Sequence, residues 1–300
     1  MVIARLKGGV GNQLFIYAAA RRLSLNNNVP LKLDIISGFQ RDYYQRNYRL
    51  QHFNIQGDVA SRRQSFEGIF GRVRRQVLKQ LAKFSEFEQR RYITEEFPEF
   101  DPRLLNLKVN GITYLDGIWA SEQYFKDIEG IIREDLKIVT RHDPQDLALA
   151  AKIQSSNSVG LHVRRLHGVP RKSEAKPNPA IPALSIDYYQ RGIEIIAGKV
   201  ADPVFYCFGD YPQWFSQNNQ MDFPLVVINH NKDEKDYEDL WLMSLCKHFV
   251  IANSTFSWWG AWLSDHPGKI VITPGGINDR AIPQMTIFSR EAIPSGWLKI

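Results

Sequence analysis

Polar residues follow three apolar segments in the second half of the chain, and their types suit an anionic ligand. His-Val-Arg-Arg ends the segment at 158–165, Phe-Gly-Asp ends the one at 204–210, and small polar residues at 253–257 follow the one at 249–252. An arginine side chain presents a fixed fork of donors that matches a phosphate group. The candidate binding residues are therefore His162, Arg164, Arg165, Asp210, Asn253, Ser254, Thr255 and Ser257.

Each of these groups also has a purely structural interpretation. A pair of arginines at a strand end often belongs to an internal salt bridge, and strand alternation puts Arg165 on the face opposite to the other two candidates of its segment. The hydroxyls after Asn253 are typical caps of a helix that begins there, and Asp210 suits a turn. Helix capping and anion binding are compatible, because both occur at the first turn of a helix.

A glycine-rich turn near the amino terminus is a second candidate binding element. Gly-Gly-Val-Gly-Asn-Gln at 8–13 joins a predicted strand to a predicted helix, where backbone N–H groups favour an anion. Gly11, Asn12 and Gln13 are therefore candidate contacts. The turn also matches two thirds of a dinucleotide fingerprint, with Asp34 as the ribose-binding acid, but leucine occupies the third glycine position. The alternatives are a tight turn that binds nothing and an NAD-dependent oxidoreductase.

Alternating strands and helices are needed to position these segments. Apolar runs at 2–6, 29–34 and 111–116 alternate with segments of helical periodicity, and the rhythm begins again after the polar stretch at 140–144. This pattern is typical of an α/β fold with parallel sheets. We predict two Rossmann-like domains that face a central cleft, comprising residues 1–148 and 149–300. The tryptophans at 258, 259 and 262 are expected in the core.

Composition excludes several classes of protein. The mean hydropathy of −0.32 and the lack of a run of about 20 apolar residues argue against a membrane-spanning protein, and the first residues do not resemble a signal peptide. Two cysteines, Cys207 and Cys246, provide neither a disulfide framework nor a zinc site. Because no Asp-x-Asp motif or phosphate-binding P-loop is present either, we expect a cytoplasmic protein that needs no metal and no cofactor.

The net charge of +6 is concentrated in one segment. Residues 61–83 contain seven basic residues and one acidic residue, Glu67, so their excess equals that of the whole chain. The rest of the chain is balanced, which argues against nucleic-acid binding. One interpretation is a solvated helix that packs one apolar side on its domain. The other is an electrostatic dock, residues 62–83, for anionic lipid at the inner face of the plasma membrane. The apolar side comprises Phe70, Val73, Val77, Leu81 and Phe84.

Taken together, these motifs resemble glycosyltransferase family 11, the α-1,2-fucosyltransferases, in its bacterial form. The similarity rests on four blocks, at 7–18, 115–125, 162–165 and 239–259, of which the last is the most specific. It implies a GT-B architecture with an acceptor-side first domain and a donor-binding second domain. The implied reaction is an inverting, metal-independent transfer of L-fucose from GDP-β-L-fucose to a sugar hydroxyl, with an α-1,2 linkage to galactose. The expected partners are GDP-fucose and an oligosaccharide or lipid-linked glycan.

The resemblance also implies roles for individual residues. Arg164 would stabilise the leaving phosphate, Arg165 would brace the site, and His162 and Asp210 would hold the nucleoside. The three hydroxyl residues at 254–257 would add neutral donors. The general base stays open among four candidates, which are Asp34, Glu95, Asp116 and His167.

One position departs from the family pattern. The family signature continues His-x-Arg-Arg-x-Asp, whereas this chain has His167 at the last position. A histidine cannot replace an aspartate as an anion, although it can accept a proton near neutral pH. Two alternatives follow: the same fold with another GDP-sugar donor, or a nucleotide-sugar binder without catalytic activity.

Overall fold

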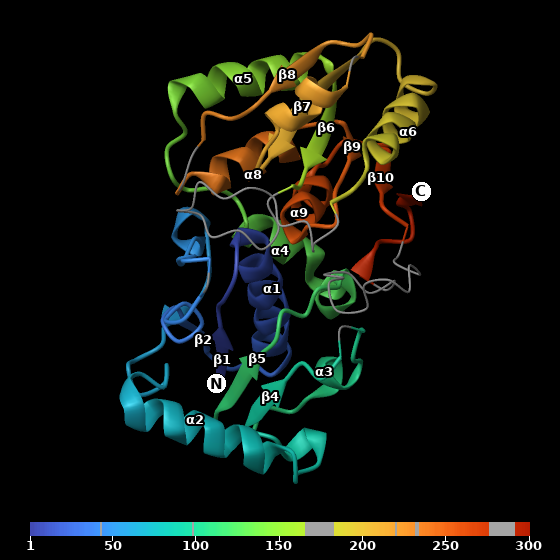
Figure 1. Cartoon of the computed structure of the whole chain (residues 1–300). Coiled ribbons are helices and arrows are strands. Elements are labelled where there is room, and N and C mark those ends of the chain that lie inside the picture. Colours follow the sequence, from blue (N-terminus) through green and yellow to red (C-terminus); the bar gives the residue numbers. More distant parts are fainter. Residues whose placement is uncertain (43, 98, 166–182, 220, 232–233, 276–291) are drawn as a thin grey trace. The chain divides into compact units, whose positions relative to one another are not determined.

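A computed structural model describes the chain except residues 43, 98, 166–182, 220, 232–233 and 276–291. The described residues form two compact units (Figure 1). The first comprises Met1–Val139 with 292–293, and the second comprises the residues from Thr140 onward with Pro294–Ile300. The second unit thus begins at Thr140 rather than at the predicted residue 149. The reason is helix α5 (Pro144–Ser155), which buries Ala150 and Ile153 in the core of the second unit.

The first unit is built on a parallel sheet of five strands in the order β3-β2-β1-β5-β4. The strands are β1 (Val2–Arg5), β2 (Leu31–Asp34), β3 (Asp58–Val59), β4 (Tyr92–Thr94) and β5 (Thr113–Asp116). The helices are α1 (Val10–Asn26), α2 (Gly68–Ala82), α3 (Arg103–Asn106) and α4 (Glu129–Asp135), with 3-10 turns η1 (Leu50–His52), η2 (Phe87–Gln89), η3 (Glu122–Tyr124) and η4 (Lys126–Ile128).

Helix α1 follows β1 directly and packs back on the sheet. The turn between them contains Gly8, whose positive φ of 75° lets the chain reverse within a few residues. Most of α1 is buried, because apolar side chains surround it over several turns. On the sheet, Ile3, Tyr92 and Tyr114 form a cluster with Ala82 of α2. The first βα unit predicted from the sequence is therefore confirmed.

The second unit is built on a parallel sheet of six strands in the order β11-β10-β9-β6-β7-β8. The strands are β6 (Asn157–Val163), β7 (Pro203–Gly209), β8 (Leu225–Val227), β9 (His248–Val250), β10 (Val271–Thr273) and β11 (Leu298–Lys299). The other helices are α6 (Ile186–Ala197), α7 (Gln213–Asn218), α8 (Asp236–Ser244) and α9 (Thr255–Leu263).

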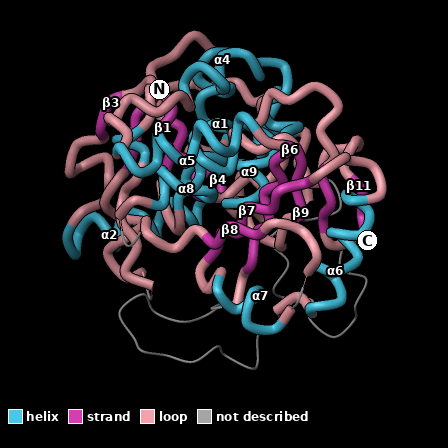
Figure 2. The backbone as a smooth tube through the Cα atoms, turned by 90° about the horizontal axis from the view of Figure 1, so that it is seen from above, coloured by secondary structure: helices cyan, strands magenta, loops and turns pink. Residues whose placement is uncertain are grey.

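Side chains of this sheet alternate between two apolar clusters. Tyr206 and Phe208 of β7 point to the face covered by α5, α8 and α9, whereas Phe205 and Cys207 point to the face covered by α6 and α7. Helices α5 and α8 lie side by side on the first of these faces (Figure 2). The sheet is therefore buried on both sides, as parallel sheets are.

Most predicted elements are present, with some differences. The tryptophans of α9 are buried, which confirms their place in the core. The segment of helical periodicity that follows residues 111–116 forms two 3-10 turns and the short helix α4 rather than one helix. Strands β3, β4 and β11 have only two or three residues each, too few for a clear sequence pattern. Across the described ranges, no helix has the length and apolarity to cross a membrane.

Candidate active site

The carboxyl ends of β6 and β7 place two of the candidate motifs next to each other. In their register, His162 pairs with Phe208 and Val163 pairs with Gly209, so the arginines that follow β6 lie beside Asp210. Gly209 has a φ of 145°, and a Cβ atom there would lie 1.9 Å from the carbonyl oxygen of Val163. Only glycine fits this position, and the close approach of the two chains sets the geometry of the arginines.

Among the residues that the structure describes, Arg164 makes one ion pair. Its Nη1 atom lies 3.2 Å from Oδ2 of Asp210, and the exposed fractions of the two side chains are 27% and 15%. A guanidinium group has five N–H donors. The pair therefore orients Arg164 and leaves it able to donate to a further anion.

Arg165 is placed to brace the same loop. Its backbone N–H donates to Oδ1 of Asp210 at 2.8 Å, and its Nη1 atom donates to the carbonyl of Leu184 at 3.1 Å. Its guanidinium also lies over the ring of Trp214, 3.9 Å from the centroid. The backbone of Arg165 thus shares Asp210 with Arg164, whereas its side chain contacts Leu184 and Trp214 instead, as the alternation of the strand predicts.

The start of α9 lies at the same edge of the sheet, because β9 is the other neighbour of β6. Here Asn253 has a buried Oδ1 atom with no hydrogen-bond partner among the residues that the structure describes. A buried acceptor without a partner is costly unless a ligand or water supplies a donor. His162 is buried beside this turn and stacks on Phe256, with 5.4 Å between ring centroids.

The three hydroxyl residues at the start of α9 are all buried, and two of them have a defined structural position. Ser257 is fully buried, and its hydroxyl donates to the carbonyls of Ala252 and Ser254 at 3.2 Å. This side chain serves the helix, which corrects the prediction that it faces a ligand. Ser254 is the N-cap residue, and its side chain makes no capping bond within the described part of the chain. Thr255 follows it as the first residue of α9 and is also buried.

In the first unit, the side chain of Gln13 links the glycine-rich turn to the backbone of a neighbouring segment. Gln13 is fully buried, and its Nε2 atom donates to the carbonyls of Gly8 and Asn47, both at 2.9 Å. Its Oε1 atom accepts from the backbone N–H of Arg49 at 2.9 Å. The structure therefore places Gln13 in the interior and not on a ligand-facing surface. Gly11 is also buried, and Asn12 is partly exposed.

The carboxylate of Asp34, at the end of β2, accepts hydrogen bonds from groups of its own unit. It accepts from the backbone N–H groups of Ile36 at 3.0 Å and Ser37 at 2.9 Å, and from the hydroxyls of Ser37 and Tyr114. The carboxylate thus fixes the turn after β2. Its acceptor positions are not available to a ribose, as the dinucleotide alternative required, or to a proton donor.

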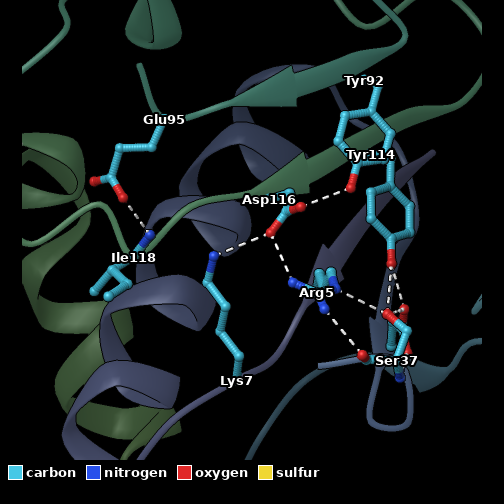
Figure 3. Close-up of polar contacts among 9 residues, drawn as sticks. Arg5, Lys7, Ser37, Tyr92, Glu95, Tyr114, Asp116 and Ile118 are labelled. Atoms are coloured by element: carbon cyan, nitrogen blue, oxygen red, sulfur yellow. Dashed lines mark hydrogen bonds and ion pairs between the residues drawn. The ribbon is translucent and has the colours of Figure 1, made fainter. Parts of the chain in front are cut away.

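Asp116, at the end of β5, forms the centre of a charged network (Figure 3). Oδ1 lies 3.0 Å from both Arg5 Nη1 and Lys7 Nζ, and the hydroxyl of Tyr92 donates to Oδ2 at 2.6 Å. Burial acts to raise the pKa of Asp116, but the charges of Lys7 and Arg5 outweigh it and hold the pKa well below its usual range. A carboxylate with such a low pKa is a weak general base.

Glu95 has a different environment. One of its oxygens accepts from the backbone N–H of Ile118 at 2.7 Å (Figure 3). The other accepts from the backbone N–H of Trp119 at 2.8 Å. Burial raises its pKa, although these two hydrogen bonds oppose the shift. Trp119 has a positive φ of 60°, which is unusual for a residue with a large side chain. Glu95 therefore fixes the strained loop after β5.

The basic and phenolic partners of these carboxylates were not among the residues predicted from the sequence. Arg5 and Lys7 alternate at the end of β1, and this spacing was the available signal that both project to one face. Tyr92 has no such signal, because β4 is too short to show a pattern, and Tyr114 of β5 meets Asp34 of β2 only through the pairing of the sheet. The fourth candidate base, His167, lies outside the described residues.

The described residues contain no group of three or more His, Cys, Asp and Glu side chains arranged to hold a metal ion. The carboxyl edge of the second sheet instead carries a guanidinium at Arg164, an amide at Asn253 and a hydroxyl at Ser254. Such an edge suits a phosphate group.

Two α/β units, each built on a parallel sheet with polar residues at its carboxyl edge, form the architecture of the GT-B fold. The chain belongs to glycosyl transferase family 11, whose family model matches residues 1–294.

Named relatives agree with this assignment. The chain is 31% identical to an alpha-1,2-colitosyltransferase of Escherichia coli over 100% of this chain and 99% of the relative. It is also 31% identical to the O-antigen biosynthesis glycosyltransferase WbnK of Escherichia coli, over 90% of this chain and 92% of that one. Among solved structures, the fucosyltransferase NodZ from Bradyrhizobium has a TM-score of 0.53 at 16% identity, covering 89% of this chain and 96% of NodZ. The last similarity concerns the fold alone.

Proposed function

We propose that the protein transfers L-fucose from GDP-β-L-fucose to a hydroxyl of a galactose residue in a glycan, with inversion and an α-1,2 linkage. The observation that carries this proposal is the position of Arg164, a partly exposed cation at the carboxyl edge of the second sheet. The family assignment supports it. So does the similarity in fold to an α-1,6-fucosyltransferase that was co-crystallised with GDP.

Arg164 would act on the leaving group. Breaking the bond between the sugar and the phosphate puts negative charge on the β-phosphate and positive charge on the sugar ring. A preorganised donor aimed at such charge lowers the barrier by about 3–4 kcal/mol. In this proposal the guanidinium of Arg164 and the start of α9 supply that stabilisation, and the reaction needs no metal ion.

Asn253 would contact the bound donor directly. Its buried Oδ1 atom accepts no hydrogen bond from the described residues, so a ligand N–H or hydroxyl would satisfy it. Asp210 would keep Arg164 in place while the phosphate binds. His162, stacked on Phe256, would shape the apolar side of the same edge.

The carboxylates of the first unit would have a positioning role. Asp34, Glu95 and Asp116 are each engaged by backbone or side-chain donors of their own unit. None of the three presents a carboxylate ready to accept a proton from the acceptor hydroxyl. In this proposal they hold the strand ends that form the acceptor side.

Colitose is a second candidate for the transferred sugar, because a curated relative that matches the whole chain is an alpha-1,2-colitosyltransferase. Colitose is L-fucose without its 3-hydroxyl group. A site built to hydrogen-bond that hydroxyl rejects the deoxy sugar strongly, whereas an apolar site distinguishes the two only weakly. The ratio of the two rates therefore reports the chemistry of the sugar site.

The test is a transfer assay with GDP-fucose and GDP-colitose, a soluble galactose-terminated acceptor, and EDTA in parallel reactions. We expect transfer of fucose that EDTA does not reduce, and thermal stabilisation by GDP but not by UDP or NAD. Faster transfer of colitose would replace the proposed donor with its deoxy analogue. Binding of GDP with neither transfer nor donor hydrolysis would indicate a nucleotide-sugar binder and would overturn the proposal.

A further inference from the structure

Helix α2 of the first unit carries an apolar stripe that faces solvent. Phe70 is 92% exposed and Phe84, two residues beyond the end of α2, is 88% exposed, and each side chain between them on the stripe is more than half exposed. The spacing of three and four residues places the stripe on one side of the helix. Its members are Phe70, Val73, Val77, Leu81 and Phe84.

A different side of α2 attaches the helix to its unit. Leu78 and Ala82 pack in the cluster formed by Ile3, Tyr92 and Tyr114. The interpretation in which the stripe packs on the domain is therefore wrong. Figure 1 shows α2 at the margin of the first unit, beside β4. Contiguous apolar surface of this kind is uncommon on soluble proteins and usually marks an interaction site.

The same segment carries the excess positive charge of the chain. Its basic residues are Arg62, Arg63, Arg72, Arg74, Arg75, Lys79 and Lys83. Across the described residues, Glu67 is the one carboxylate paired with them, 3.5 Å from Arg62. The phosphates of a lipid surface would therefore meet cations that carboxylates of the described residues neutralise only in small part.

The basic residues of α2 differ in their distance from the stripe. Arg74 adjoins the stripe, whereas Arg72, Arg75 and Lys79 lie on nearly the opposite side of the helix. A helix with its side chains is about 10–12 Å wide, and the Debye length at physiological salt is about 8 Å. That width exceeds the Debye length, so the far charges act on a surface that the stripe contacts chiefly through their long side chains, which can extend toward it.

We propose that α2 docks the protein on an anionic lipid surface. The stripe enters the boundary between headgroups and acyl chains, and the arginines and lysines contact lipid phosphates. Helices that lie in a membrane interface combine these two features. The positive charge favours a negatively charged surface as the occupant over a second copy of this chain, whose own α2 would repel it. This inference does not depend on the identity of the donor sugar.

Vesicle flotation tests the proposal with the full-length chain. We expect the protein to float with vesicles that contain phosphatidylglycerol and to remain behind with pure phosphatidylcholine, and to be released by 0.5 M salt. Each basic residue near the surface contributes a factor of about five to partitioning. The variant Arg74→Glu, beside the stripe, should therefore lower partitioning by at least about fivefold, and Arg72→Glu/Lys79→Glu, on the far side, should lower it less. Arg191→Glu, at an exposed residue of α6, is the matched charge control.

The apolar part is tested separately. Phe70→Ser/Phe84→Ser should abolish flotation, whereas Leu147→Ser, at a half-exposed residue of α5, should leave it unchanged. Transfer to a soluble acceptor should be equal in all these variants, which distinguishes docking from loss of the active site. Equal binding to neutral vesicles, or no binding at low salt, would overturn the proposal. So would a dimer in light scattering that Phe70→Ser/Phe84→Ser converts to a monomer.

Discussion

At the carboxyl edge of the first sheet, Asp116 is engaged by Arg5, Lys7 and Tyr92. At the carboxyl edge of the second sheet, Arg164 has one ion pair within the described residues, with Asp210, and keeps a partly exposed side chain. Both edges end parallel strands and both carry charge. They differ in how much of the hydrogen-bonding capacity of each side chain is used within the protein.

This difference indicates that the first edge stabilises the fold, whereas the second edge binds a ligand. A charge that is surrounded by partners stabilises the fold, because removing it leaves buried groups unpaired. A charge that is oriented but only partly engaged remains able to bind a ligand. Changes at the first edge should therefore lower stability, and changes at the second edge should lower catalytic rate.

The largest effect is expected for Arg164→Ala. Loss of one donor that faces developing charge lowers kcat by about 10²–10³-fold, and the melting temperature should change little because Arg164 is partly exposed. Arg164→Lys should recover only part of the rate, since lysine keeps the charge but not the planar fork. Steady-state kinetics with saturating acceptor measures the loss.

The control for Arg164 is Arg191→Ala on the exposed side of α6. It removes the same charge from the same unit and should leave kcat unchanged. If Arg164→Ala retained full kcat and lost only stability, the ion pair with Asp210 would be structural, and the contrast between the two edges would not hold.

Asp116→Asn should have the next largest effect, on stability. The change leaves Arg5 and Lys7 beside a neutral amide, which we expect to cost about 3 kcal/mol of unfolding free energy. Asp127→Asn is the control, because Asp127 pairs with Arg22 at the surface and is 55% exposed. Exposed pairs of this kind contribute about 1 kcal/mol or less. Urea denaturation of both variants measures the difference.

The pH dependence of this effect has a defined sign. The pKa of Asp116 is lower in the folded protein than the ordinary value of 3.8 for an aspartate. Its contribution to stability is therefore complete above about pH 4 and declines as the pH falls below that value. The difference in stability between the wild-type protein and Asp116→Asn should shrink in acid. A constant difference from pH 7 to pH 3 would exclude the charge as its cause.

The fold followed from the sequence because parallel strands between helices carry strong local signals. Apolar runs such as 158–163 and 204–208 identified β6 and β7 nearly to the residue. The register of these strands then places Arg164 beside Asp210, which only the structure shows. The exposure of Phe70 and Phe84 could not be predicted from the sequence either, because periodicity identifies an apolar side of a helix without showing what covers it.

The partners of the candidate carboxylates could not be predicted for a related reason. Tyr92 and Tyr114 are separated by more than twenty residues and meet only because β4 and β5 pair. Asp34 and Asp116 looked available as bases in the sequence, where a strand-end carboxylate has no visible partner. Long-range pairing converts such a residue from a reactive group into a brace.

Gln13→Ala should give an intermediate loss of stability. It removes hydrogen bonds to Gly8 and Asn47 and leaves the backbone N–H of Arg49 without this acceptor. Given about 1 kcal/mol for each bond, we expect a loss of about 2–3 kcal/mol. Gln76→Ala, at an exposed residue of α2, should change stability by less than about 0.5 kcal/mol. A fall in donor affinity without a fall in stability would instead place Gln13 at the ligand.

The smallest effect separates function from stability at a single side chain. Asn253→Ala removes a buried acceptor that has no partner in the described residues, so the free energy of unfolding should be unchanged or slightly higher. The same change removes one contact to the proposed donor and should weaken GDP binding about tenfold, equivalent to about 1.4 kcal/mol. Asn253→Asp should weaken binding further, because a carboxylate repels the phosphate. Calorimetric titration with GDP, beside urea denaturation of the same variants, measures both quantities. A loss of stability with unchanged GDP affinity would show that Asn253 stabilises the fold, as Asp116 does in the first unit. The proposed difference in function between the two edges would then rest on Arg164 alone.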